Sequence, residues 1–392
     1  MRLTRRGLIG AGAAGVAAAA AGGAALGRDT TGHDDTVPFT GAHQAGIVTA
    51  QQEHLHFAAF DMAPEARASD LRDLLRTWSA AAARMTAGRP VGSLGGDPLA
   101  PPADTGEAAG LPAARLTVTF GLGPALFDRR FGLAARRPAA LRPLPALPGD
   151  ALEPDRSGGD LCVQACADDP QVAFHAVRNL ARLGRGIAVL RWSQLGFGRA
   201  ASTSRRQATP RNLLGFRDGT RNLRAEDTAA IAEHVWASEP AWLRGGTYVV
   251  ARRIRMLIEV WDRAALDDQE QTIGRRKASG APFGGHAEFD PIHAARLPPD
   301  SHVRLALPET NGGIQILRRG YNFTDGLDER LGQLDAGLFF IAFTRDPAHF
   351  VALQRRLGAH DKLNEYIEHV GSGVWAVPPG ASAGGWVGET VL

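Results

Sequence analysis

One order of predicted elements occurs twice in this chain, and that duplication constrains the fold more than any other feature. In the first half, short apolar runs and alternating apolar residues predict strands at 55–61, 116–120, 161–167 and 186–192. Apolar residues at helical spacing predict helices at 64–85 and from Pro170 to about residue 180. The order is strand, helix, strand, strand, helix, strand.

The second half follows the same order after a linker rich in Ser, Arg, Thr and Pro at 201–212. Strands are predicted at 247–260, 314–323 and 338–343, and helices at 263–273 and 347–357. Tandem split βαβ units of this kind predict an α+β fold of two antiparallel sheets with helices outside. The predicted divisions are 1–27 leader, 28–40 linker, 41–200 first domain, 201–212 linker and 213–392 second domain.

The N-terminus carries an export pattern. Arg5 and Arg6 stand in Thr-Arg-Arg-Gly-Leu-Ile, and an uncharged stretch rich in Ala and Gly follows to Gly27. This pattern resembles a twin-arginine signal, and small residues at 23–27 suit a signal peptidase. A run of about 20 residues is also long enough to span a bilayer. A retained anchor and a cytoplasmic arm therefore stay open beside the favoured reading, export to the periplasm, the cell envelope or the medium.

Charge gives no sign of a nucleic-acid partner. The chain has 44 Lys and Arg against 41 Asp and Glu, but residues 1–27 hold three arginines and no acid. Removing that segment leaves 41 of each sign, so the remainder is formally neutral. Without a long basic run, neither nucleic acid nor an acidic membrane surface is predicted as a partner.

The two cysteines do not suggest a redox pair. Cys162 and Cys166 lie four residues apart on one predicted strand, which separates them by roughly 13 Å and is too far for a disulfide. They are expected to be small buried residues, with a redox pair or metal site as the alternative. Because no Cys-x-x-Cys or His-Glu-x-x-His spacing occurs, a metal would have to arrive inside an organic cofactor.

Three segments of the second half carry a family resemblance. They are Arg-Asn-Leu-Leu-Gly-Phe-Arg-Asp-Gly-Thr-Arg-Asn at 211–222, Asp-Ser-His-Val-Arg-Leu-Ala-Leu-Pro at 300–308, and Ile-Gln-Ile-Leu-Arg-Arg-Gly-Tyr-Asn-Phe at 314–323. Together they resemble the haem-binding core of dye-decolorizing peroxidases, in particular the exported branch related to iron-uptake-linked deferrochelatases. The resemblance covers nearly the whole chain beyond residue 41. It implies two tandem ferredoxin-like domains packed sheet to sheet, one haem b per chain, and a homo-oligomer.

The resemblance assigns His302 as the haem iron ligand. An imidazole that binds metal through one nitrogen usually donates a hydrogen bond from the other to a carboxylate, which orients the ring and raises its basicity. The family's carboxylate falls on Asp335 of this sequence. The alternative for Asp335 is a turn acid that precedes Gly337.

The resemblance assigns Asp218 as the acid of the distal pocket, although Asp218-Gly219 alone would be read as a turn. The acid would take a proton from the peroxide oxygen that binds iron and deliver it to the departing oxygen. Arg318 is the expected distal arginine, which would stabilise charge on peroxide. In a strand, Arg318 shares the more apolar face, so we expect it to be more buried than Arg319.

Two further residues complete the predicted site. Arg275, in a segment that also matches the family, is expected to pair with a haem propionate, with an ordinary basic loop as the alternative. Asn222 is expected to support the Asp218 loop.

The sequence thus predicts a haem peroxidase that reduces H2O2 through a ferryl intermediate and oxidises one-electron donors such as dyes or phenolics. The alternative is an exported haem-binding protein or deferrochelatase that releases iron from haem, with an iron-uptake system as its partner. A cofactor-free exported binding module on the same fold is a third possibility.

Overall fold

A computed structural model describes residues 35–329 and 331–392. The predicted export signal at 1–27 lies outside these residues. Within them, no helix is both long enough and apolar enough to cross a membrane.

The first half contains the six predicted elements. They are β1 (His54–Met62), α1 (Ala68–Thr86), β2 (Thr117–Leu122), β3 (Leu161–Ala167), α2 (Pro170–Leu183) and β4 (Ala188–Arg199). Helix α2 begins where the sequence indicates, because the Asp169 side chain accepts from the backbone N–H groups of Gln171 and Val172, and Pro170 needs no such partner. The short 3-10 helices of this half are η1 (Pro124–Leu126), η2 (Ala134–Arg136) and η3 (Pro154–Arg156).

The second half departs from prediction at several places. The predicted strand 314–323 is two strands, β6 (Leu317–Arg318) and β7 (Tyr321–Asp328), interrupted at Arg319 and Gly320. The strand predicted at 247–260 ends at Met256. A last strand, β9 (Ile367–Val377), was not predicted. The half also contains α3 (Thr228–His234), β5 (Thr247–Met256), α4 (Ile258–Trp261), α5 (Leu266–Ile273), α6 (His302–Ala306), β8 (Gln333–Thr344) and α7 (Pro347–His360), with the 3-10 helices η4 (Ala241–Leu243), η5 (Ala294–Arg296), η6 (Pro308–Thr310) and η7 (Lys362–Glu365). Of these, the helices α3, α4 and α6 were also not predicted.

All strand pairs are antiparallel and form one sheet in the order β5-β9-β2-β3-β1-β4-β7-β8-β6. Because β5 also pairs with β8, the sheet closes into a barrel-like ring. The two junctions between the halves are narrow: β2 meets β9 only at Leu122 and Ala376, and β4 meets β7 only near Phe197 and Arg199. With β6 and β7 counted as one strand, the spatial order is the same in each half: β1 lies between β3 and β4, and β5 lies between β8 and β9.

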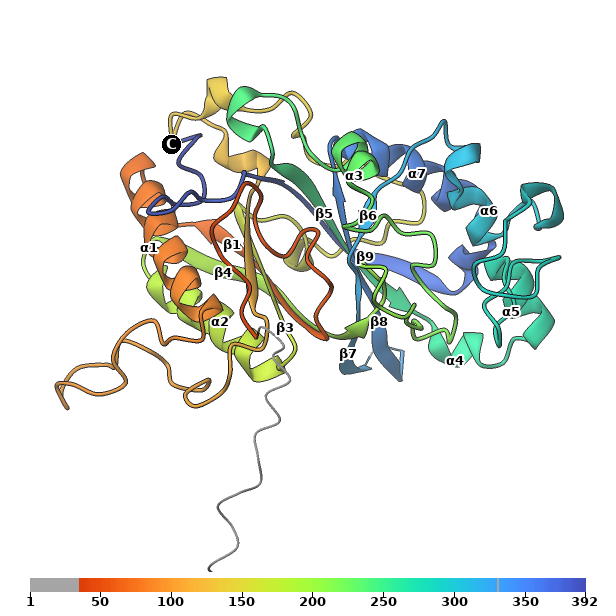
Figure 1. The fold of residues 1–392 in the computed structure, drawn as a ribbon, viewed down its shortest axis with the longest axis horizontal. Helices are drawn as coiled ribbons and strands as arrows, with labels where there is room; N and C mark the ends of the chain where they lie inside the picture. The colour runs from red at the N-terminus through yellow and green to blue at the C-terminus, as the bar shows by residue number, and fades with distance from the viewer. Residues whose placement is uncertain (1–34, 330) are drawn as a thin grey trace, which may run out of the picture. The chain divides into compact units, whose positions relative to one another are not determined.

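The main cores lie on the two faces of this sheet. Helices α1 and α2 cover the first half, while α5, α6 and α7 lie at the other side (Figure 1). The cluster between the halves joins Phe57 of β1 to Phe339 of β8 and Trp375 of β9, with ring centroids 5.2 and 5.5 Å apart. Cys162 and Cys166 are free and buried in this cluster, which confirms the prediction that they are packing residues.

Candidate functional site

A cavity lies between strands β5 and β8 and helices α6 and α7. Its volume is about 240 Å³. The three sequence segments that carried the resemblance converge on it. Five of the six predicted site residues line the cavity, namely Asp218, Asn222, Arg275, His302 and Arg318.

Apolar side chains form most of the remaining wall. The sheet contributes Ile254, Met256, Leu338 and Phe340, and helix α7 contributes Phe350, Leu353 and Leu357. A space bounded by a sheet and a helix layer, with a few polar groups at defined points, suits a flat and largely apolar organic group.

His302 is the first residue of α6, and its ring lines the cavity. Its Nδ1 lies 2.6 Å from Oδ2 of Asp361, a carboxylate with 3% of its side chain exposed. Burial lowers the pKa of His302, but the charge of Asp361 and its hydrogen bond outweigh burial, so the pKa lies above its usual value. Because Nδ1 is engaged, Nε2 is the nitrogen left to bind a metal, and within the described residues it has no hydrogen-bond partner.

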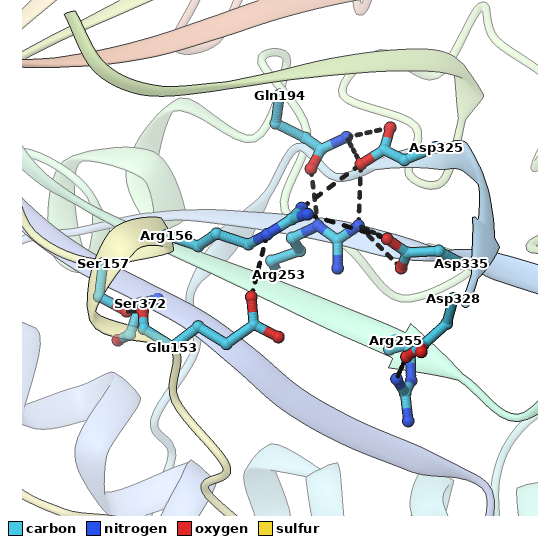
Figure 2. A network of polar contacts seen from close by, with 10 residues as sticks. All are labelled: Glu153, Arg156, Ser157, Gln194, Arg253, Arg255, Asp325, Asp328, Asp335 and Ser372. Carbon is cyan, nitrogen blue, oxygen red and sulfur yellow. Dashed lines mark hydrogen bonds and ion pairs between the residues drawn. The ribbon is translucent and has the colours of Figure 1, made fainter. Parts of the chain in front are cut away.

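The prediction that Asp335 is the carboxylate beside His302 is wrong. Asp335 lies on β8 and accepts from Nη2 of Arg253 on the neighbouring strand β5, at 2.9 and 2.8 Å. Figure 2 shows this pair in a polar network with Asp325, Arg156 and other residues, and Asp335 does not line the cavity. The reason is that Arg253 is nearly fully buried and takes both aspartates as counter-ions.

Asp361 had no signal in the sequence. It follows helix α7 directly, and its Oδ1 accepts from the backbone N–H of Leu363 at 2.9 Å, so locally it is only a capping aspartate of η7. Its contact with His302, 59 residues away in sequence, exists only because α6 packs against α7.

Asp218 and Arg318 form an ion pair inside the cavity. Nη1 of Arg318 donates to Oδ1 of Asp218 at 2.6 Å, and Nδ2 of Asn212 donates to Oδ2 at 3.3 Å. The side chains are 14% and 29% exposed, respectively. A half-sheltered carboxylate beside a guanidinium can accept a proton and hold a small polar molecule at the same place.

The turn that follows Asp218 depends on glycine. Gly219 has a φ of +93°, and a Cβ there would lie 3.0 Å from Cα of Ala201 and from the backbone nitrogen of Ser202. Positive φ and close backbone approach both favour glycine. Gly219 begins the turn 219–222, in which the N–H of Asn222 donates to the Gly219 carbonyl at 3.0 Å, so this turn follows the acid directly.

The expectation that Arg318 is more buried than Arg319 is wrong. Arg319 is fully buried and donates to the carbonyl of Thr49 and the side chain of Gln52, whereas Arg318 is partly open to the cavity. Alternation along the strand separates the two faces correctly. It does not show that polar groups from the segment at 49–52 cover the Arg319 face.

Asn222 fixes the backbone of Arg318. Its Oδ1 accepts from the Arg318 N–H at 2.9 Å, and its Nδ2 donates to the Arg318 carbonyl at 2.8 Å and to the Ser202 carbonyl at 3.0 Å. Asn222 thus ties the Asp218 loop to the strand that carries the arginine.

Arg275 is 5% exposed and lines the cavity. Its Nη1 donates to the carbonyls of Gly280 at 2.6 Å and Glu288 at 2.9 Å. Burial lowers the pKa of Arg275, and the charge of Glu288 opposes that shift. No hydrogen bond within the described residues engages Nη2, so the guanidinium retains capacity for a carboxylate.

These groups fit a haem better than a bare metal ion. Within the described residues no group of three or more His, Cys, Asp or Glu could hold a metal, so one histidine is the natural fifth ligand of an iron that a porphyrin already holds. The apolar walls suit the macrocycle and Arg275 suits a propionate. With an acid and an arginine in the same cavity, the fold and site define a haem enzyme that handles peroxide.

Comparison with known protein families agrees with this class of enzyme. Residues 44–198 match the model described as Dyp-type peroxidase, N-terminal, and residues 209–382 match Dyp-type peroxidase, C-terminal. The chain therefore belongs to the Dyp-type peroxidase family, and it is a haem-dependent peroxidase, an oxidoreductase.

Individual relatives are similar over most of the chain. A protein named Deferrochelatase from Yersinia pseudotuberculosis is 37% identical over 372 residues, which cover 91% of this chain and 84% of the relative. An oxyferrous complex of DtpA from Streptomyces lividans is 41% identical, with a TM-score of 0.84, and the match covers 91% of this chain and 97% of DtpA. A DyP-type peroxidase from Cellulomonas bogoriensis is 39% identical, with a TM-score of 0.81, and the match covers 91% of this chain and 98% of that peroxidase.

Proposed function

We propose that this peroxidase binds one haem b in the cavity, reduces H2O2 there, and oxidises small one-electron donors such as phenolics or dyes. The observation that carries the proposal is the convergence of two charged pairs, His302 with Asp361 and Asp218 with Arg318, on a single cavity. Titratable groups that converge in a cavity with mostly apolar walls are typical of a functional site.

The haem, when bound, supplies an iron that accepts peroxide and takes up its oxidising equivalents. The protein holds it through Nε2 of His302, which Asp361 orients and makes more electron-donating through the hydrogen bond at Nδ1. Arg275 binds a propionate, and the apolar residues of β5, β8 and α7 exclude water from the macrocycle.

Asp218 moves the proton. Its carboxylate accepts a proton from one oxygen of H2O2 and delivers it to the other, which departs as water; a step of this kind is worth ~10²–10⁴-fold in rate. Arg318 stabilises the negative charge that develops on the departing oxygen. The ion pair between them holds the carboxylate aimed at one place before peroxide arrives.

Visible absorption tests this proposal. The purified protein is expected to show a Soret band that changes on addition of one equivalent of H2O2. Asp218→Ala is expected to keep the band and lose the fast change, while His302→Ala loses the ligation itself. A wild-type Soret band that peroxide leaves unmoved, or an Asp218→Ala variant that reacts at the wild-type rate, would contradict the assigned role of Asp218.

A second candidate function is release of iron from haem, which the name of the Yersinia relative favours. Haem-loaded protein would then yield free iron and a metal-free porphyrin, which porphyrin fluorescence detects. Fluorescence that grows without peroxide would support iron release. Its absence, beside a rapid peroxide reaction, would leave peroxidase activity alone.

We also propose the finer organisation expected from the sequence: a twin-arginine leader at 1–27, export, ferredoxin-like domains at 41–200 and 213–392, and a homo-oligomer that serves an iron-uptake system. The identical strand order of the two halves supports the domains, and Arg5 and Arg6 support the leader. Mass spectrometry of the exported protein's N-terminus tests the leader. An intact Met1 in the membrane fraction would contradict cleavage.

A further inference from the structure

Glu288 contacts two residues of the segment 217–220, which carries Asp218. Its Oε2 lies 3.1 Å from Nη1 of Arg217, and its Oε1 accepts from the hydroxyl of Thr220 at 3.0 Å. The two donors flank Asp218 and Gly219 directly. Only 10% of the Glu288 side chain is exposed. This sheltered carboxylate contacts the residues at both ends of the segment 217–220, which carries the proposed acid.

The backbone of the same residue contacts the proposed propionate arginine. The Glu288 carbonyl accepts from Nη1 of Arg275 at 2.9 Å. Four residues later, Ile292 lines the cavity. Glu288 is therefore the point at which the segment 217–220, the anion-binding arginine and this stretch of the cavity wall are connected.

We infer that Glu288 is a positioning residue that holds the segment 217–220 so that the Asp218 carboxylate meets Arg318 and peroxide in one fixed arrangement. The inference rests on the proposed role of Asp218. The contacts of Glu288 fix the residues on both sides of Asp218 and Gly219, in addition to the bond from the Asp218 N–H to the Pro210 carbonyl at 2.9 Å. Without them, Asp218 has more freedom to move away from Arg318. Misplacement of a reacting group by about 1 Å can cost ~10²-fold in rate.

The chain offers a matched control on the same loop. Arg221 pairs with Glu309 at 2.9 Å, but both side chains are largely exposed, at 46% and 60%. Glu309→Gln removes the same charge and one ion pair to the loop, without touching the segment 217–220. An effect of Glu288 that Glu309 does not share comes from its sheltered position and not from net charge.

The first measurement is the rate of the peroxide reaction in haem-loaded variants. Glu288→Ala is expected to lower the second-order rate constant by ~10–10²-fold, while transfer of haem to a haem acceptor protein proceeds at the wild-type rate. Glu288→Gln keeps the volume and one acceptor oxygen, so it should recover part of the loss. Glu309→Gln should react like the wild type. Wild-type reactivity in Glu288→Ala, or an equal loss in Glu309→Gln, would overturn the inference.

The second measurement needs no haem and no activity. Amide hydrogen exchange of the haem-free protein, followed by mass spectrometry of peptides, should show faster exchange confined to about 209–222 in Glu288→Ala. Faster exchange across the whole second half would mean that Glu288 only stabilises the fold, which overturns positioning. If Asp218→Ala reacts like the wild type, the role of Asp218 fails on its own, and the exchange result still decides whether Glu288 holds the segment.

Discussion

At the scale of single residues, the carboxylate beside His302 is Asp361, which had no signal in the sequence, and not Asp335, which was expected there. Asp361 is bonded to the ring of His302, and Asp335 is bonded to the buried guanidinium of Arg253. Both are carboxylates at the end of a regular element, so their chemistry is the same. Their partners differ because each one faces a different strand or helix. We therefore expect substitution of Asp361 to affect haem chemistry and substitution of Asp335 to affect stability.

Asp361→Ala is expected to impair haem chemistry. Loss of a partner that orients a metal-binding histidine typically costs ~10–100-fold in affinity or activity. The expected result is faster haem loss and a slower peroxide reaction, measured by haem transfer and stopped-flow absorption. The retention of wild-type values in this variant would show that the hydrogen bond at Nδ1 has no role.

Asp335→Ala is expected to impair stability and not haem binding. It leaves Arg253 with Asp325 as its remaining counter-ion, since Arg253 Nη2 also bonds Asp325 at 2.8 Å. The free energy of unfolding should fall by about 2 kcal/mol, below the ~3–5 kcal/mol of a fully orphaned buried charge. Denaturant unfolding gives this quantity. A changed Soret band in Asp335→Ala would contradict the assignment.

At the scale of elements, the backbone of the segment 217–220 sets the position of the Asp218 carboxylate. Gly219 in this segment has a positive φ and lies close to another part of the backbone. The Asp-Gly pair is a turn signal in any sequence. That the turn lies against Ala201 and Ser202 is a tertiary fact. Gly326 has nearly the same φ, +92°, but a Cβ there would meet no atom within 4 Å. Comparing substitutions at the two glycines therefore separates the cost of the positive φ from the cost of the close contact.

Gly219→Ala is expected to destabilise the protein by more than Gly326→Ala. Both place a Cβ in the left-handed region, at about 1–2 kcal/mol, but only the Cβ at 219 meets backbone atoms at 3.0 Å. Gly219→Ala should also slow the peroxide reaction, because the turn must shift. Thermal unfolding and stopped-flow absorption measure the two effects. Equal losses of stability in both variants would mean that the contact with Ala201 and Ser202 is unimportant.

At the scale of the whole molecule, stability depends on a closed sheet whose halves meet through narrow junctions and a shared core. Strand β1 carries a histidine, His56, on the face opposite to this core, where its ring stacks on Phe174 of α2. His56 is 6% exposed, with no partner for Nδ1 in the described structure. Burial lowers the pKa of His56 to about 4. Folding therefore keeps this ring neutral at pH values where the unfolded chain would protonate it.

The pH dependence of unfolding should show this. The folded pKa lies below the unfolded value of 6.5, so the stability due to neutral His56 is fully present above pH 6.5 and is lost as the pH falls towards 4. The loss approaches about 3 kcal/mol. In His56→Gln the decline of unfolding free energy over this range should be shallower, as denaturant titrations at several pH values would show. An unchanged slope would mean that His56 is protonated in the folded protein.

The sequence by itself determined the elements and the identities of most site residues. Apolar periodicity and caps such as Asp169 are local, so β1, β3 and α2 could be placed from the chain alone. The motifs around Asp218, His302 and Arg318 were also visible, because they resemble the haem-binding core of a known family, whereas Asp218-Gly219 taken alone indicates only a turn. The strand β9 was missed because glycine and polar residues at its start hide its pattern.

Only the tertiary structure decided how these pieces are connected. Ring closure through β5 and β8, the pairing of His302 with Asp361, the burial of Arg319 and the contacts of Glu288 all join residues far apart in sequence. Such contacts depend on which faces pack together, and packing responds to the shape of the whole core. Alternation along a strand can state that two side chains point to opposite faces, but the protein around the strand determines which face becomes the cavity.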